Sequence, residues 1–576
     1  MARENAIRWL DWTDEAFRRA RIENKPILLD ISAVWCHWCH RLDHDTYEVP
    51  EIAEYVESHF IPIRVDTDKR PDINRRYNMG GWPTTAFLTP DGSIMGGGTY
   101  FPPDQMQQIL REISSTWEKT KNQQLPPFIP ETDNMPVGTI SISIVDEILG
   151  DIANNFDPIY GGFGSQPKFP CTDAHELVLL KYHYTRNREI RNIATLTLQT
   201  VGKSGLFDSE MGGFFRYSTV RDWNIPHYEK MSEDNAKWLS LYLHAYQVTG
   251  EQYYATIAKR ILDYVMTWLS DQENGCFYGS QDADEKYYGL IRNERLKVKA
   301  PYVDKQFYTN WNALMISSFF EASAILRENS IRNFAMKSLD RLMLLNYDGK
   351  QMLHYDNESD LSPQLADQTQ TARTLCHAYE LTGGREFLQK AEDLIRSAID
   401  RLYDKECGGF FDISVDANAP GYLRKPVKPF DENSVASRVL LKLSHLTGQE
   451  YYHNLADETL RRFVTVYPQY GIMAADYALA VDAFMNEPTV IRIIGSFEKE
   501  QTLRLLAESN RIYEPRKIIQ AYDPDRDAVH ITELGYPNSD HPTAFICMGR
   551  VCSAPVTDPS NLNSELTRLK LGQLRK

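Results

Sequence analysis

The stretch AVWCHWCHRL contains two cysteines and two histidines in five consecutive residues: Cys36, His37, Cys39 and His40. A cysteine pair with two intervening residues can exchange electrons with other thiols through a disulfide. Alternatively, Cys36, His40 and His44 share one helical face at i, i+4 and i+8 and could bind zinc. The sequence contains no second CxxC and no distant histidine pair to supply a fourth ligand, which favours redox chemistry over metal binding.

The elements around the cysteines suit a thiol–disulfide site. The strand ILLDIS leads into the cluster and a helix follows it, so the first sulfur lies at a helix N-terminus, where free N–H groups lower a thiol pKa. We expect Cys36 to be an exposed nucleophile and Cys39, one turn deeper, to be the resolving thiol. A protonated His37 would make the couple more oxidising than a Gly-Pro spacer would. Trp38 and His40 are expected to pack or to face the substrate.

Residues 1–122 are expected to form one α/β domain with a central sheet. Apolar runs predict strands at 26–32, 61–67, 84–89 and 93–100, and helical spacing predicts helices at 14–25, 47–60 and 104–120 as well as after the cysteines. Proline-rich residues 123–138 are interpreted as a linker.

The sequence pattern of residues 139–487 predicts helices only. Twelve are expected, near 140–155, 172–185, 189–203, 232–248, 251–270, 309–326, 330–345, 362–381, 385–402, 431–447, 449–467 and 471–486. A Thr-Gly pair recurs in the short links, with its threonine at 249, 382 and 447, so the separations are 382 − 249 = 133 and 447 − 382 = 65. The repeat unit is therefore a helical hairpin of about 65 residues, and six such hairpins form either a solenoid or a closed ring.

The long connections between hairpins all emerge at one end, because successive helices run antiparallel. They carry Gly, aromatic and acidic residues together, as in YGGFGSQPKFP and CGGFFDIS. Since function often resides on loops held by a rigid scaffold, this end is the second candidate site. The alternative is that the GGF loops are tight turns with a packed aromatic ring.

The segment PILLDISAVWCHWCHRLD resembles the thioredoxin active site. The resemblance implies that Trp35 precedes the nucleophile, that Asp30 is the buried acid that assists proton transfer, and that Pro83 in GGWPTT is cis and faces Cys36. More widely, CHWCH, GGWPTTAFLTPDG, PHYEKMSEDNA, TNWNALMI and CSAPVTDP resemble the spermatogenesis-associated, DsbH/YyaL-type family. That resemblance implies a thioredoxin-like domain followed by an (α/α)6 toroid similar to those of glycosidases and N-acylglucosamine 2-epimerases.

Sugar chemistry in such toroids uses paired carboxylates, sometimes with histidine. Phe215 and Tyr217 are expected to join an aromatic floor, and the other pocket candidates are Trp223, His227, Glu229, Asp234, Asp282, Asp284, Trp311 and Glu432. The competing interpretation is that Asp234, Asn310, Asp367 and Glu432 cap helix N-termini. We expect the pocket to bind a carbohydrate-like ligand.

Residues 488–576 are expected to form a small α/β domain, with strands TVIRIIG, RKIIQAY and TAFICMGRVC, a helix KEQTLRLLAESN, and little order after Ser553. Cys547 and Cys552 near its end are either a second redox pair or two ordinary thiols.

The bulk properties limit the partners. The 576 residues carry a net charge of −16, which opposes binding to nucleic acid or an anionic membrane. The start of the sequence lacks an apolar signal segment, so we expect a cytoplasmic protein. The resulting hypothesis is a thiol–disulfide oxidoreductase with a protein thiol or disulfide partner and no cofactor beyond its own disulfide. The alternatives are a sugar-modifying enzyme with a regulatory thioredoxin-like domain, and a zinc-binding or scaffold protein.

Overall fold

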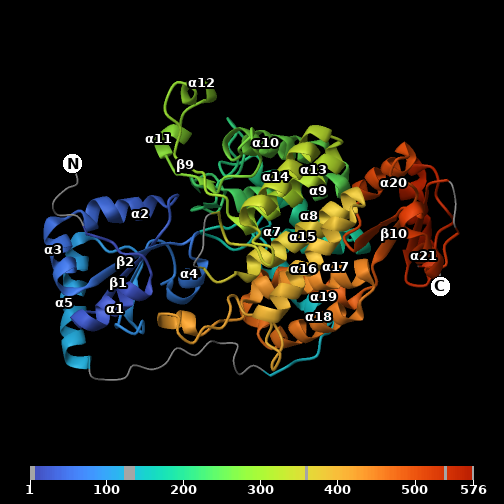
Figure 1. Ribbon diagram of the computed structural model, residues 1–576. Coiled ribbons are helices and arrows are strands. Elements are labelled where there is room, and N and C mark those ends of the chain that lie inside the picture. The colour runs from blue at the N-terminus through green and yellow to red at the C-terminus, as the bar shows by residue number, and fades with distance from the viewer. Residues whose placement is uncertain (1–6, 122–135, 357–360, 538–540, 574–576) are drawn as a thin grey trace. The chain divides into compact units, whose positions relative to one another are not determined.

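The computed structural model describes residues 7–121, 136–356, 361–537 and 541–573 (Figure 1), so most of the predicted linker lies outside the described residues. The chain divides into two compact units. The N-terminal unit contains the described residues of Met1–Asn134 together with Ser280–Asp304 and Phe411–Lys428, and the larger unit contains the rest. Two loops of the helical region thus belong to the N-terminal unit.

The N-terminal unit is built on a four-stranded sheet in the order β2-β1-β3-β4. β1 is parallel to β2 and antiparallel to β3, and β3 is antiparallel to β4. The strands are β1 (Ile27–Ser32), β2 (Ile61–Asp66), β3 (Thr84–Leu88) and β4 (Ile94–Gly98). The helices are α1 (Asp14–Glu23), α2 (His37–Leu42), the π-helical turn η1 (Asp43–Tyr47), α3 (Pro50–His59), α4 (Pro71–Tyr77) and α5 (Pro103–Thr120). All predicted elements are present, and α4 is an additional one.

Side-chain alternation along the strands places a separate core on each face of this sheet. Ile27, Leu29 and Ile31 pack with α1 and α4 on one face. Leu28 packs on the opposite face with Leu42 of α2 and with apolar residues of η1, α3 and α5. Asp30 alternates with Leu29 and Ile31 and therefore lies on the same face as α2.

The segment Phe411–Lys428 completes the first of these cores. Ile413, Tyr422 and Leu423 are buried within it. Tyr422 stacks on Tyr77 with ring centroids 5.2 Å apart, and the Arg76 guanidinium pairs with Asp412 at 2.7 Å. The N-terminal unit therefore depends on residues more than 300 positions away in the sequence.

The larger unit contains a closed ring of six inner helices. Contacts run from α7 to α9, α13, α15, α17, α19 and back to α7, which excludes the open solenoid. The inner helices are α7 (Thr172–Thr185), α9 (Ser232–Thr249), α13 (Thr309–Leu326), α15 (Leu365–Thr382), α17 (Phe430–Thr447) and α19 (Ala475–Met485). Their outer partners are α8 (Arg188–Val201), α10 (Gln252–Trp268), α14 (Asn329–Asn346), α16 (Arg385–Leu402), α18 (Glu450–Phe463) and α6 (Ser143–Asn155). α6 and α19, from the two ends of the region, form the sixth pair.

The Thr-Gly repeat marks the turn of three hairpins for a physical reason. Gly250, Gly383 and Gly448 each have φ near +75°, the left-handed conformation that ends a helix. The preceding threonine hydroxyl donates to the carbonyl four residues earlier, as from Thr249 to Ala245 at 2.7 Å. The repeated pair is thus a helix C-cap.

The GGF loops are tight turns, as the second interpretation predicted. In each, the N–H of an aspartate donates back across the turn, as from Asp208 to Gly213 O at 3.0 Å and from Asp404 to Gly409 O at 2.9 Å. The following phenylalanine is buried, and in two of these loops its N–H donates to an asparagine of the next inner helix, from Phe214 to Asn235 and from Phe410 to Asn433, each at 2.7 Å. These loops therefore join hairpins together.

The C-terminal domain repeats the sheet order of the N-terminal one. Its strands are β10 (Thr489–Ile494), β11 (Lys517–Tyr522), β12 (Thr543–Met548) and β13 (Val551–Cys552), in the order β11-β10-β12-β13. The parallel and antiparallel pairings match strand for strand. The helices are α20 (Glu500–Arg511), α21 (Pro524–Glu533) and α22 (Leu562–Gln573).

The expectation of little order after Ser553 is wrong, because Leu562 and Leu566 of α22 are buried in the core of this domain. Across the described part of the chain, none of the helices combines the length and the apolar character needed to cross a membrane.

Candidate functional site

The two cysteines of the CxxC stretch form a disulfide with their Cα atoms 5.2 Å apart. Cys36 is the N-cap of α2, and its sulfur accepts a hydrogen bond from the Cys39 N–H at 3.1 Å. His37, the first residue of α2, is partly exposed. Cys36 is only 4% exposed, in contrast to the exposed thiol that we expected.

Two tryptophans bring the cysteine segment next to the proline loop. Trp35, itself buried, lies edge-on against Trp82 with ring centroids 5.7 Å apart. The Trp82–Pro83 peptide bond is cis, as the resemblance implied. The proline loop therefore lies beside Trp35, the residue that precedes Cys36.

Asp30 is the buried acid of this site. Its Oδ2 accepts from Arg64 Nε at 2.6 Å, and its Oδ1 is buried without a hydrogen-bond partner among the described residues. Burial, opposed by Arg64, raises the pKa of Asp30 to about 6. The carboxyl group therefore changes protonation close to neutral pH, on the sheet face that α2 covers.

The segment Ser280–Asp304 reaches the helix that carries the cysteines. Asp282 Oδ2 lies 3.3 Å from His40 Nε2, and this hydrogen bond raises the pKa of His40. Asp284, by contrast, caps the short helix α11 (Glu285–Tyr288) by accepting from the Tyr287 N–H at 2.9 Å. Both aspartates thus belong to the N-terminal unit, and their predicted place in the toroid pocket is wrong.

The proposed zinc ligands do not converge. His40 contacts Asp282 and the Val34 carbonyl, whereas His44 contacts Asp45 at 2.9 Å. Within the described ranges, no three His, Cys, Asp or Glu side chains are grouped so that they could hold a metal ion.

The structure does not assemble the predicted aromatic floor. Trp223 is fully buried and its indole N–H donates to the Tyr160 carbonyl at 3.0 Å, while Phe215 is 3% exposed. Both rings serve packing. Tyr217 remains partly exposed and stacks on His227 with centroids 4.5 Å apart.

His227 and Glu229 do lie together. Their side chains are 3.3 Å apart between Nδ1 and Oε1, and the second oxygen of Glu229 is buried without a hydrogen-bond partner in the described structure. This pair, next to Tyr217, is the part of the predicted pocket that the loops assemble.

The remaining pocket candidates occupy equivalent positions on the inner helices. Asp234, Trp311 and Glu432 are each the third residue of their helix. Burial raises the pKa of Asp234 to about 7, although its side chain retains accessible surface. Asp234 is therefore poised to exchange a proton near neutral pH.

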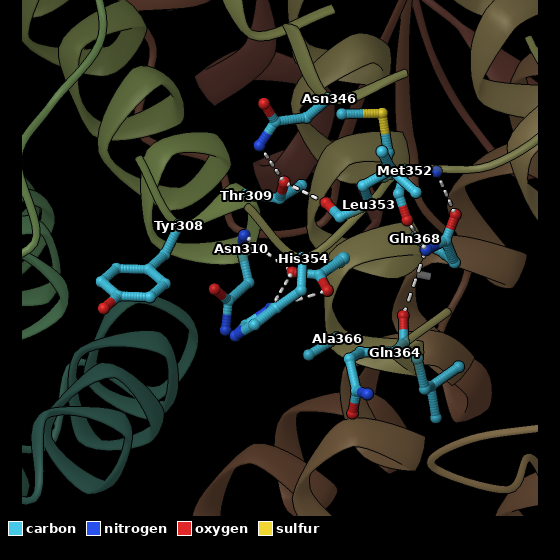
Figure 2. A network of polar contacts seen from close by, with 12 residues as sticks. Tyr308, Thr309, Asn310, Asn346, Met352, Leu353, His354, Gln364, Ala366 and Gln368 are labelled. Carbon is cyan, nitrogen blue, oxygen red and sulfur yellow. Dashed lines mark hydrogen bonds and ion pairs between the residues drawn. The ribbon is translucent and has the colours of Figure 1, made fainter. Parts of the chain in front are cut away.

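Asp367, the third residue of α15, caps a neighbouring helix. Figure 2 shows its surroundings: His354 Nδ1 lies 2.9 Å from its carboxylate, and the Asn310 N–H of α13 donates to it at 3.0 Å. The next residue, Gln368, exchanges two hydrogen bonds of 2.8 Å with the Met352 backbone, to the right of His354 in Figure 2. The capping interpretation thus holds for Asp367, with the cap supplied to the adjacent hairpin.

A second layer of ionisable residues on the inner helices was missed from the sequence. It consists of His244, Glu321, His377 and Lys442, each the thirteenth residue of its helix. Each lies six positions before the left-handed C-cap residue of its helix, which is residue 250, 327, 383 or 448. Aligning the hairpins on these C-caps would therefore have identified the layer.

The two histidines of this layer have opposite charge preferences. Burial lowers the pKa of His244, but Glu176 at 2.9 Å and Glu321 at 3.7 Å outweigh it and raise the pKa to about 9. Burial lowers the pKa of His377 to about 4. A cationic and a neutral imidazole near one carboxylate form an acid and base arrangement, and all these side chains keep partial exposure.

Comparisons with known proteins agree with this architecture. Residues 1–127 match the Thioredox_DsbH family, described as a protein of unknown function, DUF255, and residues 174–296 match the N-acylglucosamine 2-epimerase family. Human spermatogenesis-associated protein 20 is 25% identical over 98% of this chain and 90% of its own. A thioredoxin from Pyropia yezoensis is 36% identical over 12% of this chain and 65% of its own.

Solved structures similar to the chain include cellobiose 2-epimerase from Spirochaeta thermophila DSM 6192, with 14% identity over 60% of this chain and 97% of that one and a TM-score of 0.48. The GH76 α-mannanase BT2949 from Bacteroides thetaiotaomicron matches at 13% identity over 59% and 96%, with a TM-score of 0.43. With its thioredoxin-like N-terminal domain and its six-hairpin toroid, the chain resembles the spermatogenesis-associated, DsbH-type proteins, as its motifs predicted.

Proposed function

We propose that the N-terminal unit is a thiol–disulfide oxidoreductase that acts on a protein thiol or disulfide in the cytoplasm. The observation that carries this proposal is the Cys36–Cys39 disulfide at the start of α2, on the sheet face of a buried acid with a pKa of about 6.

The reaction in the reducing direction has two steps. The Cys36 thiolate attacks a partner disulfide, so that a mixed disulfide forms and the partner's first sulfur leaves as a thiolate. Cys39 then attacks Cys36, releases the second partner thiolate and closes the Cys36–Cys39 bond. Asp30 accepts the proton that Cys39 gives up, because a carboxylate with a pKa near 6 is ionised at neutral pH and still basic enough to bind a proton.

Cysteine variants test the assignment. We expect Cys36→Ser to abolish reduction of a model protein disulfide, and Cys39→Ser to accumulate a mixed disulfide on Cys36 that peptide mapping detects. Cys407→Ser, which removes an exposed free thiol, is the control and should be fully active. Full activity of Cys36→Ser would contradict the proposal. Metal analysis of protein purified without chelator tests the zinc alternative.

For the toroid we propose a carbohydrate-like ligand bound by the inner helices. The support is the pair of histidines with opposite charge preferences, together with Glu321 and the proton-exchanging Asp234. Polar side chains that retain accessible surface inside a rigid ring are able to bind hydroxyl groups.

A thermal-shift screen of mono- and disaccharides tests this second proposal. At least one sugar should raise the melting temperature of the intact protein, and His377→Ala should remove the shift. Cys376→Ala, which changes the adjacent buried residue of the same helix, should retain it. Equal shifts in both variants, or none in the intact protein, would refute the ligand site.

A further inference from the structure

The C-terminal domain contains a second disulfide on an exposed edge. Cys547 and Cys552 are directly paired residues of the antiparallel strands β12 and β13, with Cα atoms 4.0 Å apart. Cys547 is 3% exposed and lies in the domain core, whereas Cys552 lies on the exposed edge strand β13. One sulfur-bearing residue therefore faces solvent and its partner does not.

A hydrogen-bond donor is directed at the buried sulfur. Tyr536 Oη lies 3.5 Å from Cys547 Sγ, and Arg492 Nη1 lies 2.8 Å from the same phenol oxygen. A guanidinium can only donate, so the phenol oxygen accepts from Arg492, and a disulfide sulfur carries no hydrogen. The Tyr536 hydroxyl therefore donates to Cys547.

Arg492 is itself held in place for this contact. Its Nε donates to the Gln520 side chain at 2.7 Å. A phenol that is hydrogen-bonded to a cation is a better donor than a free one. This series of hydrogen bonds, from Gln520 through Arg492 to Tyr536, would thus stabilise negative charge on the Cys547 sulfur.

A purely structural role accounts poorly for this disulfide. The hairpin is already closed without it, since Ser553 N–H donates to Ile546 O at 2.7 Å. The loop that the bond closes contains only residues 548–551, and the stabilisation from closing a loop falls as the loop shortens.

We propose that Cys547–Cys552 is a second thiol–disulfide exchange site, one that reacts with an anionic small thiol. The thiolate attacks Cys552, so that a mixed disulfide forms, and the Cys547–Cys552 bond breaks with its electron pair on Cys547. A second thiolate then attacks the mixed disulfide, and the protein dithiol and the oxidised small disulfide result. Two thiols lose two electrons, and the protein disulfide gains them.

The preference for an anionic thiol follows from the turn between the strands. Arg550 is exposed and lies two residues before Cys552, so its positive charge favours a thiol that carries carboxylates, with glutathione as the probe. This site needs no contribution from Cys36 and Cys39, and it can be tested in protein that lacks them.

The first experiment compares two variants in a Cys36→Ser/Cys39→Ser background, each of which keeps one cysteine of the Cys547–Cys552 pair. Oxidised glutathione should modify Cys552 in the Cys547→Ser variant at least 10-fold faster than it modifies Cys547 in the Cys552→Ser variant. Peptide mapping after alkylation measures both rates. Equal rates, or faster modification of Cys547, would overturn the proposed direction of attack.

The second experiment measures cleavage of the intact disulfide by reduced glutathione at pH 7.5. Tyr536→Phe, which keeps the ring, should slow cleavage at least 5-fold, whereas Tyr451→Phe on the surface of α18 should not change it. Arg550→Gln should slow the reaction with glutathione and leave the reaction with uncharged 2-mercaptoethanol unchanged. A disulfide that resists both thiols in the folded protein, or that is cleaved equally fast in Tyr536→Phe, would refute the site.

Discussion

Asp30 is the residue whose protonation controls the proposed chemistry. In Asp30→Asn the amide cannot accept the Cys39 proton, so we expect disulfide exchange at pH 7 to slow by about 100-fold, the low end of general-base contributions. The rise of the wild-type rate between about pH 5 and pH 7, which follows the pKa of about 6, should disappear in the variant. Stopped-flow measurements across this pH range test both expectations.

Asp43→Asn is the matched control, because Asp43 also pairs with Arg64 but keeps partial exposure. It should keep the rise of the rate with pH, with the midpoint moved to lower pH because the Asp43 charge helps to raise the Asp30 pKa. An unchanged profile in Asp30→Asn would show that another group accepts the proton.

The same pKa has a consequence for stability. Since burial raises the Asp30 pKa from 3.8 to about 6, the folded unit binds the proton more tightly than the unfolded chain. The free energy of unfolding therefore decreases as pH rises from about 4 to about 6, by about 3 kcal/mol for a shift of two pKa units. Asp30→Asn should lack this contribution to the pH dependence and should be more stable than wild type at pH 8.

At the scale of elements, the segment Ser280–Asp304 raises the pKa of a histidine on α2, the helix that carries the disulfide. Asp282→Asn removes the negative charge that hydrogen-bonds to His40, so the pKa of His40 should fall towards its ordinary value near 6.5. An NMR titration of the His40 ring measures this change.

Asp284→Asn is the control for that titration, because Asp284 caps α11 and has no role in the His40 contact. A pKa of His40 that is the same in Asp282→Asn and wild type would contradict the contact. Because His40 lies one residue after Cys39, a change in its charge is also expected to change the reactivity of the disulfide.

Most helices and the longer strands were predictable, since each follows from a local pattern, but α4, α21, α22 and the short strands between Tyr217 and Asp304 were not predicted. The predicted strands around Asp30 and the twelve helices are present, and the Thr-Gly pairs cap hairpins as their repetition suggested. The prediction of an aromatic floor was wrong because a sequence does not show which tryptophan is buried. The sequence offered Trp223 and Trp311 as equal candidates, yet of these two only Trp223 is fully buried.

At the scale of the molecule, the N-terminal unit is discontinuous and should not be fully stable alone. Arg76 has no exposed side-chain surface and pairs with Asp412, which is 2% exposed. Asp412→Ala leaves a buried charge without its partner, a change that typically costs about 3–5 kcal/mol.

We expect Asp412→Ala to increase hydrogen exchange in α4, and a fragment of residues 1–121 to show the same loss of protection. Asp416→Asn, an exposed change in the same segment, should behave as wild type. Full protection of α4 in the isolated fragment would show that the distant segment is dispensable.

The sequence by itself determined the CxxC pair, its placement at a helix start, the principal strands of both α/β domains, and the repeated hairpin. Each of these depends on residues close together in the chain, where periodicity and capping operate. Only the tertiary structure decided that Asp282 meets His40, that Asp412 neutralises Arg76 and that Tyr536 donates to Cys547. Two of these contacts join residues more than 200 positions apart, and in all three the packing of separate segments within one unit brings together groups that no local pattern relates.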